Sequence, residues 1–260
     1  MKGLLYYFSG TGNTKWVADT LKKHFRNNKI DLELLNIEKV DEVKRNQFDF
    51  LIIGSPVYAE IEPKIVDDFL NKLPKCIRNF KTIIYATQGG KSSSAPAIMA
   101  KKLKNKGYNI FIEECIKMPN NYYFLLNKQP NVNEYDKILY NAECKVKTIV
   151  ESFMENNKLK KENSLIRIKL GKTCGSFFRR MIPKISKNIT ATSECTKCGI
   201  CLTNCPKGNI TFEDGKAVFH SKCMLCLRCI YVCPVNAITY KGKKIKQIQK
   251  DRIKGVIKCQ

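Results

Sequence analysis

The N-terminal half of the chain alternates short apolar runs with longer amphipathic stretches. Gly3–Phe8 is an uninterrupted apolar run, which is typical of a strand buried on both faces. A helical spacing near three and four follows in the apolar residues Trp16, Val17, Leu21 and Phe25. The pattern therefore predicts a buried strand followed by a helix.

The same alternation continues to about residue 155. Further strands are expected over 30–37, 48–54, 82–86 and 109–117. Further helices are expected over 63–73, 95–106 and 134–154. Strands that alternate with helices form a parallel sheet covered by helices on both faces, so the sequence predicts an α/β fold.

Small and hydroxylic residues follow the first strand, in the segment Ser9, Gly10, Thr11, Gly12, Asn13 and Thr14. Backbone N–H groups at the start of the next helix and the hydroxyls of this segment can point at one phosphate, and the glycines allow close approach. A dinucleotide fingerprint would need a third glycine where this chain has Lys15, and a nucleotide-triphosphate loop would need a Gly-Lys-Ser/Thr ending. The segment therefore predicts a phosphate site of another kind.

This segment resembles the phosphate loop of the flavodoxins, which bind flavin mononucleotide (FMN) without a lysine in that loop. The resemblance covers about residues 1–155 and implies a flavodoxin-like, doubly wound, five-stranded parallel sheet in the order 2-1-3-4-5. It places FMN at the carboxyl ends of strands one, three and four. The loops expected to meet the flavin ring consist of Ser55, Pro56, Val57, Tyr58 and Ala59, and of Thr87, Gln88, Gly89 and Gly90.

Tyr58 is the expected stacking residue for the flavin, and simple packing on the sheet edge is the alternative. Tyr122 and Tyr123, which follow the fifth strand, are further candidates to cover the ring, with simple packing again as the alternative.

The last quarter of the chain carries two cysteine runs of the form C-x2-C-x2-C-x3-C-P. The first run consists of Cys195, Cys198, Cys201 and Cys205, and the second of Cys223, Cys226, Cys229 and Cys233. In paired runs of this spacing, three ligands of a [4Fe-4S] cluster come from one run and the fourth from the other. We therefore expect Cys233 to complete the first set of three and Cys205 to complete the second.

The runs resemble those of the two-cluster bacterial-type ferredoxins, which implies a small C-terminal α+β domain with two [4Fe-4S] clusters. A zinc site is the alternative, because paired C-x2-C knuckles also bind zinc. Zinc modules usually separate two pairs by a longer spacer, so the crowding of three cysteines into each loop favours clusters. Outside the runs, Cys76, Cys115 and Cys144 are expected to be small buried apolar residues.

Four parts are expected along the chain. Residues 1–155 form a flavodoxin-like FMN-binding domain, 156–190 a basic amphipathic connecting segment, 191–240 a ferredoxin domain with two [4Fe-4S] clusters, and 241–260 a basic C-terminal tail. The apolar side of the connecting segment is expected to pack between the domains. Peripheral contact with a membrane surface, or contact with an acidic partner, is the alternative.

The N-terminus has too short an apolar core for a signal peptide, which indicates a cytoplasmic protein. No apolar stretch reaches the roughly 18 residues that a transmembrane helix needs.

The formal net charge is +24. The basic residues are spread over every expected helix, and no recognition-helix, RNA-binding or zinc-finger pattern occurs, which argues against nucleic acid as a partner. Complementary charge instead favours acidic redox proteins, namely a ferredoxin, a flavodoxin or a reductase.

The two halves together resemble the fused flavodoxin–ferredoxin proteins of anaerobes. That architecture implies an electron-transfer iron–sulfur flavoprotein, which relays electrons between FMN and two [4Fe-4S] clusters and to redox protein partners. The alternative is a flavin-dependent reductase of a small molecule that is fed by the clusters. The sequence assigns no catalytic residue, because it shows no paired catalytic acid and base. The only two histidines, His24 on the first helix and His220 between the cysteine runs, are expected to be structural or to face solvent.

Overall fold

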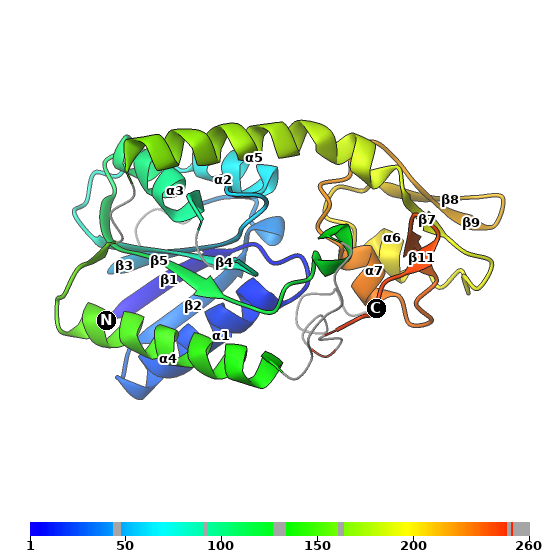
Figure 1. The fold of residues 1–260 in the computed structure, drawn as a ribbon. Coiled ribbons are helices and arrows are strands. Elements are labelled where there is room, and N and C mark those ends of the chain that lie inside the picture. The colour runs from blue at the N-terminus through cyan, green and yellow to red at the C-terminus, as the bar shows by residue number, and fades with distance from the viewer. Residues whose placement is uncertain (44–47, 91–92, 127–133, 161–163, 249–250, 252–260) are drawn as a thin grey trace. The chain divides into compact units, whose positions relative to one another are not determined.

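The computed structural model describes residues 1–43, 48–90, 93–126, 134–160, 164–248 and 251 (Figure 1). The chain divides into two compact units. The first consists of Met1–Ser9, Asn13–Asn120 and Asn133–Ser176, and the second of Gly10–Gly12, Asn121–Val132 and Phe177–Gln260. The sequence did not indicate that Gly10–Gly12 would fold with the part of the chain that carries the cysteine runs.

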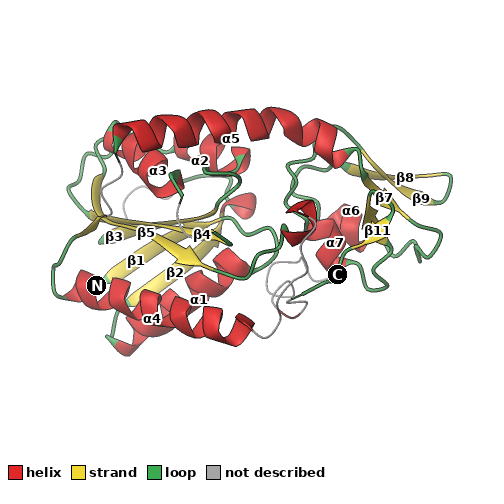
Figure 2. Cartoon of the chain, in the orientation of Figure 1, coloured by secondary structure: helices red, strands yellow, loops and turns green. Residues whose placement is uncertain are grey.

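A parallel sheet forms the centre of the first unit (Figure 2). Its strands are β1 (Lys2–Tyr7), β2 (Asp31–Asn36), β3 (Phe50–Pro56), β4 (Lys81–Gln88), β5 (Asn109–Lys117) and β6 (Leu159–Lys160), in the order β2-β1-β3-β4-β5-β6. All five neighbouring pairs are parallel. The expected doubly wound α/β fold, with the order 2-1-3-4-5 for its first five strands, is therefore confirmed.

The expected number of five strands is wrong, because β6 adds a sixth at the outer edge of β5. Leu159 pairs with Ile112 and Lys160 with Glu113. Leu159 also packs against the buried core of the sheet. A strand of two residues is too short to show an apolar period, so the sequence pattern could not reveal it.

Helices cover both faces of the sheet, with α1 (Asn13–Asn27) and α4 (Tyr135–Met154) on one face and α2 (Lys64–Lys72) and α3 (Ala95–Lys104) on the other (Figure 1). A short 3-10 helix, η1 (Ile37–Lys39), follows β2. The expected ranges of the helices and of the first five strands agree with the structure to within two residues at each end.

Aromatic rings fill the core between the sheet and the helices on the α1 side. Phe25 of α1 lies 5.1 Å from Phe50 of β3, and Phe153 of α4 lies 4.6 Å from Phe50, between ring centroids. All three side chains are buried, so helices and sheet are stabilised by the same apolar contacts.

The expected connecting segment contains the helix α5 (Leu165–Ser186), whose residues up to Ser176 belong to the first unit and the rest to the second. Its apolar residues are not all packed. Ile182 is buried, whereas Leu165, Ile166, Leu170 and Phe177 are between 62% and 79% exposed.

The second unit is built from short elements. They are η2 (Tyr123–Leu126), β7 (Ile189–Ala191), α6 (Ile200–Thr203), β8 (Ile210–Glu213), β9 (Lys216–Phe219), α7 (Arg228–Val232), β10 (Ile238–Tyr240) and β11 (Lys243–Lys244). The strands form one antiparallel sheet in the order β11-β10-β7 and the hairpin β8–β9. The hairpin turns at Asp214 and Gly215, whose φ angles of 46° and 73° suit an Asp-Gly turn of two residues.

The expectation that three cysteines outside the runs are buried is wrong for Cys144, which is exposed on α4, while Cys76 and Cys115 are only partly buried. No helix in the described part of the chain has the length and apolar character needed to cross a membrane.

Candidate functional site

The two cysteine runs adopt the same backbone conformation, and each position of the first has a counterpart 28 residues later. Lys197 and Gly199 have left-handed φ angles of 58° and 74°, and their counterparts Leu225 and Leu227 have 58° and 62°. The helices α6 and α7 then begin at counterpart positions. Because a left-handed backbone is uncommon outside glycine, its recurrence shows that both loops turn in the same way around their cysteines.

The structure brings Cys201 together with the three cysteines that were expected to share its cluster. Burial, followed by the nearby Cys195, Cys233 and Cys198, raises the pKa of the Cys201 thiol to about 11. Cys233 belongs to the other run, so this group crosses between the runs. Its role as a ligand set stays a prediction.

The second group crosses in the opposite direction. Burial raises the pKa of Cys226 to about 12 against the lowering effect of the Arg228 charge, and Cys223 and Cys205 add to the rise. Burial, Cys226, Cys223 and Cys205 raise the pKa of Cys229 well above its ordinary value, with Cys201 of the first group as a smaller cause.

One cavity of the second unit is lined by all four cysteines of the second group, Cys205, Cys223, Cys226 and Cys229. Among the described residues, no group of three or more His, Cys, Asp or Glu side chains is placed to hold a single metal ion. The cavity instead presents four thiols from two loops, which is the donor number of a [4Fe-4S] cluster.

The chemistry of these donors fits such a cluster. Four neighbouring, partly buried thiols cannot all ionise without a metal, because desolvation and mutual repulsion disfavour the thiolate. Metal coordination reverses this balance and deprotonates the ligand. Backbone N–H groups are already directed at the sulfurs, from Asn209 to Cys205 (3.3 Å) and from Ala237 to Cys233 (3.2 Å). These two bonds also occupy counterpart positions of the two runs.

The three segments predicted to bind the flavin lie at the carboxyl ends of β1, β3 and β4. Ser55 and Pro56 are the last residues of β3, and Thr87 and Gln88 are the last residues of β4. Hydrogen bonds of the backbone and of side chains join these strand ends. The N–H of Phe8 donates to the carbonyl of Gly54 (3.2 Å), and the N–H of Val57 to that of Thr87 (2.9 Å). The hydroxyls of Thr14 and Thr87 lie 2.8 Å apart. The carboxyl ends of these strands therefore place residues of all three loops in direct contact.

The start of α1 carries the groups expected to bind a phosphate. Ser9 and Thr14 are each 1% exposed, and the hydroxyl of Tyr85 donates to the carbonyl of Thr14 (3.0 Å). The Asn13 side-chain amide donates to the carbonyl of Pro119 (3.0 Å). Enclosed hydroxyls beside the N–H groups of a helix start are a combination that fits a phosphate.

Tyr58 lies in a tight turn after β3. Its N–H donates to the carbonyl of Ile61 (2.8 Å), and the two residues between them, Ala59 and Glu60, have φ angles of 47° and 79°. Left-handed non-glycine residues cost about 1–3 kcal/mol each and are held by their surroundings. The Tyr58 ring is buried at 6% exposure, and its stacking on a flavin stays a prediction. Gly89 and Gly90 of the third loop are exposed.

Part of α5 holds this turn, which the sequence did not indicate. The guanidinium of Arg167 donates to both carboxylate oxygens of Glu60 (3.0 and 2.9 Å), and the N–H of Ser94 donates to the same carboxylate (2.9 Å). A Cβ on Gly175 would lie 2.5 Å from a methyl carbon of Ile61. Arg167 is 107 residues from Glu60 in the chain, so no local pattern could reveal the contact.

In the second unit, the residues Gly10 and Thr11 of the predicted phosphate loop contact side chains that the sequence did not single out. The Nε of Arg228 donates to the carbonyl of Gly10 (3.2 Å). The Asn121 amide donates to the Thr11 hydroxyl and accepts from the hydroxyl of Tyr231 (3.3 Å).

Tyr122 and Tyr123, the other stacking candidates, both donate through their hydroxyls to backbone carbonyls of the second unit. Tyr122 bonds to Leu225, and Tyr123 to Lys246 at 2.8 Å. Their role as flavin covers stays a prediction.

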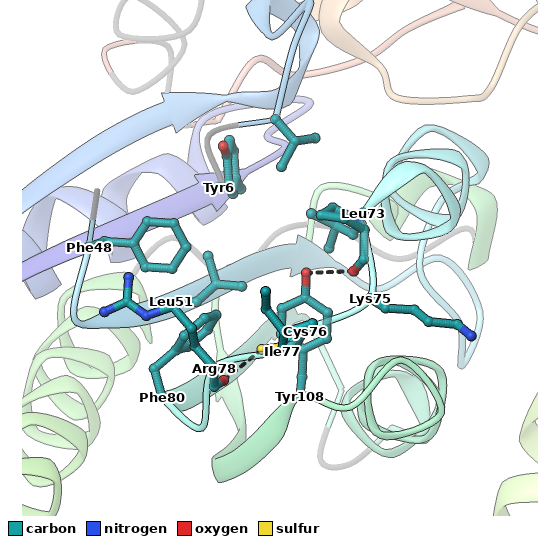
Figure 3. A pocket seen from close by; sticks show the side chains of 12 residues that line it. Tyr6, Phe48, Leu51, Leu73, Lys75, Cys76, Ile77, Arg78, Phe80 and Tyr108 are labelled. Carbon is teal, nitrogen blue, oxygen red and sulfur yellow. Dashed lines mark hydrogen bonds between the residues drawn. The ribbon is translucent and has the colours of Figure 1, made fainter. Parts of the chain in front are cut away.

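The first unit also contains a cavity of about 240 Å³ that includes no predicted site residue (Figure 3). Aromatic side chains of Tyr6, Phe48, Phe80 and Tyr108 line it. Burial raises the pKa of Tyr108 to about 12, and its hydroxyl donates to the carbonyl of Pro74 (3.1 Å).

Two family models match separate parts of the chain. A flavodoxin domain matches residues 4–116, and a 4Fe-4S dicluster domain matches residues 194–237. The first range contains all three loops predicted to bind the flavin, and the second contains all eight cysteines of the runs.

Relatives share part of the sequence. A flavodoxin of Maridesulfovibrio salexigens is 36% identical over 70 residues, which is 26% of this chain and 48% of that protein. An uncharacterised protein of Methanocaldococcus jannaschii is 31% identical over 120 residues, 45% of this chain and 75% of that protein. The chain thus spans about half of the first relative and three quarters of the second.

Solved structures with similar folds include a flavodoxin from the domain Archaea, with 18% identity and a TM-score of 0.44 over 59% of this chain and 99% of that chain. Flavodoxin 2 of Bacillus cereus has 19% identity and a TM-score of 0.44 over 59% of this chain and all of that chain.

Proposed function

We propose that the chain relays electrons between FMN and two [4Fe-4S] clusters. It then passes them to redox protein partners. The chain belongs to the fused proteins that join a flavodoxin domain to a 4Fe-4S dicluster domain, and these domains give it an electron-transfer role. When bound, the flavin supplies one- or two-electron chemistry and each cluster supplies one-electron chemistry.

The observation that carries the proposal is the crossing of the cysteines into two groups of four. Each group takes three thiols from one loop and one from the other, and burial raises the pKa of Cys201 in the first group and of Cys226 and Cys229 in the second. The proposed ligands are Cys195, Cys198, Cys201 and Cys233 for one cluster, and Cys205, Cys223, Cys226 and Cys229 for the other. Cys201 and Cys233 are buried, whereas Cys198 is exposed, and exposure of the sulfurs to water helps to set the potential of a cluster.

For the flavin, we assign the phosphate to the start of α1. The hydroxyls of Ser9, Thr11 and Thr14 and the N–H groups of Gly10–Asn13 orient it there. The loops of Ser55–Ala59 and Thr87–Gly90 supply backbone groups to the polar edge of the ring, with Tyr58 at one face. The contacts that join these loops support the assignment.

The proposed partners are acidic redox proteins. The chain carries a net charge of +24, and α5 has six Lys or Arg residues and no Asp or Glu. A positive surface accelerates the encounter with a negative one, and the acceleration falls as salt is added.

Anaerobic reconstitution of the full chain with iron, sulfide and excess FMN tests the cofactors. After desalting, we expect about eight irons and one FMN per chain, since a cubane holds four irons. Cys226→Ser should lose about half of the iron, whereas Cys174→Ser, at an exposed cysteine outside the runs, should lose none. Clusters retained without stoichiometric flavin would remove FMN from the proposal, and zinc in place of iron would remove the relay.

A further inference from the structure

One buried cation lies within the second cysteine run. Arg228 stands between Cys226 and Cys229 at the first position of α7 and is only 3% exposed. It lines the cavity that is also lined by all four cysteines of the second group. Its positive charge is therefore buried beside these four thiols.

The guanidinium is held in place by backbone carbonyls of the second unit. Its Nε donates to Gly10 and its Nη1 to Asn204, both at 3.2 Å. Asn204 is itself 4% exposed and directly precedes Cys205, a member of the second group. The cation therefore lies on the segment that supplies three of these thiols and bonds to the residue before Cys205, the fourth.

The first run has no buried charge, because its one cation within 195–205, Lys197, is exposed. The counterpart of Arg228, 28 residues earlier, is Ile200, which begins α6 as Arg228 begins α7. The two loops have left-handed residues at the same positions, so Ile200 and Arg228 occupy equivalent places. At this place the two predicted cluster sites differ by one full positive charge.

We propose that Arg228 sets the reduction potential of the cluster held by Cys205, Cys223, Cys226 and Cys229 above that of the other cluster, so that this cluster is the first to accept an electron. The inference rests on the proposed function, since it needs both clusters. One electron from a low-potential one-electron donor makes the cluster and its four thiolates more negative by one charge, and no proton is taken up. A fixed positive charge stabilises the more negative form.

The test is a redox titration of the anaerobically reconstituted full chain, followed by the electron paramagnetic resonance of the reduced clusters. We expect Arg228→Met to lower the equilibrium constant for reduction of one cluster by about tenfold. This corresponds to a fall of about 59 mV in the potential of a one-electron couple. Arg228→Lys keeps the charge and should restore most of the potential. Ile200→Met, the matched change in the first run, should shift neither potential.

A second background identifies which cluster responds. Cys226→Ser leaves only the first group complete, and adding Arg228→Met there should leave the surviving potential unchanged. A shift of that potential, or unchanged potentials in the single Arg228→Met variant, would overturn the inference.

If Arg228→Met does not fold, Ile200→Arg gives the reciprocal test, because a charge added to the first run should raise the potential of the first cluster. An unchanged potential in a folded Ile200→Arg chain would count equally against the inference. The iron and sulfide content distinguishes failure of the proposed function from failure of the role of Arg228. A wild-type chain without two clusters refutes the proposed function, whereas two clusters with unmoved potentials refute the role of Arg228 alone.

Discussion

At the scale of single residues, each group of four cysteines contains one cysteine from the other run. Cys233 lies with the first three cysteines, and Cys205 with the second three. Each of these two crossing cysteines also accepts an N–H bond from the residue four positions later. A change at a crossing cysteine should therefore affect the cluster of the other run.

The crossing predicts which cysteine variants resemble one another. Cys198→Ser and Cys233→Ser should leave the same cluster intact, with the same potential and electron paramagnetic resonance spectrum. Cys205→Ser should match Cys226→Ser instead. Spectra of the four reconstituted variants test this. If Cys205→Ser matched Cys198→Ser, the ligands would come from one run each, and the interlocked arrangement would be wrong.

At the scale of elements, the turn after β3 depends on helix α5. Its left-handed residues Ala59 and Glu60 are held by Arg167, and Gly175 leaves room for Ile61. A Cβ at Gly175 would also come within 2.8 Å of the carbonyl of Ala59. The turn is thus positioned by an element more than 100 residues away.

Gly175→Val should destabilise the first unit by about 1–3 kcal/mol, because the added carbons overlap the turn. It should also weaken FMN binding, since the turn carries Tyr58. Chemical denaturation and flavin titration measure the two effects. Cys174→Val, at an exposed position of the same helix, is the control and should change neither. Normal stability in the Gly175 variant would show that the turn can move away without cost.

The added strand β6 brings a pH effect. Glu113 of β5 pairs in register with Lys160 and is 6% exposed. Burial raises the pKa of Glu113 above its ordinary 4.5, and Lys104 and Lys160 only partly oppose this. Because the folded state then holds the proton more tightly than the unfolded state, stability falls as the pH rises from about 4.5 through the raised pKa.

Glu113→Gln should therefore be more stable than the wild type above that window and equal to it in acid. Denaturation midpoints measured from pH 4 to 8 give the comparison. Glu42→Gln, which changes an exposed carboxyl, serves as the control. A Gln variant that is no more stable at neutral pH would show that the charged carboxylate is well compensated in the fold.

Residues that act locally could be predicted from the sequence, and those that act at a distance could not. The strands β1, β3, β4 and β5 contain short apolar runs, and the spacing of the cysteines is itself a motif, so the sequence predicts both. The two residues of β6 show no period. Arg228 bonds to Gly10, which is 218 residues away in the sequence, and a single sequence cannot reveal such a contact. Cys144 was expected inside because cysteine is often buried, yet it lies on the exposed side of α4.

At the scale of the whole molecule, one chain joins two kinds of redox domain. A covalent connection raises the effective concentration of one centre at the other, to about the millimolar level for a short flexible link. Exchange between the centres should then be independent of protein concentration. Exchange with an acidic partner should slow as salt screens the net charge of +24.

An anaerobic redox titration of the reconstituted holoprotein tests whether flavin and clusters exchange electrons. Flavin absorbance and the electron paramagnetic resonance of the clusters are followed together. A relay predicts that flavin and clusters titrate over overlapping ranges and that the chain takes up about four electrons, two at the flavin and one at each cluster. A flavin whose reduction potential lies far above those of both clusters would retain its electrons instead of passing them on. That result would contradict the relay.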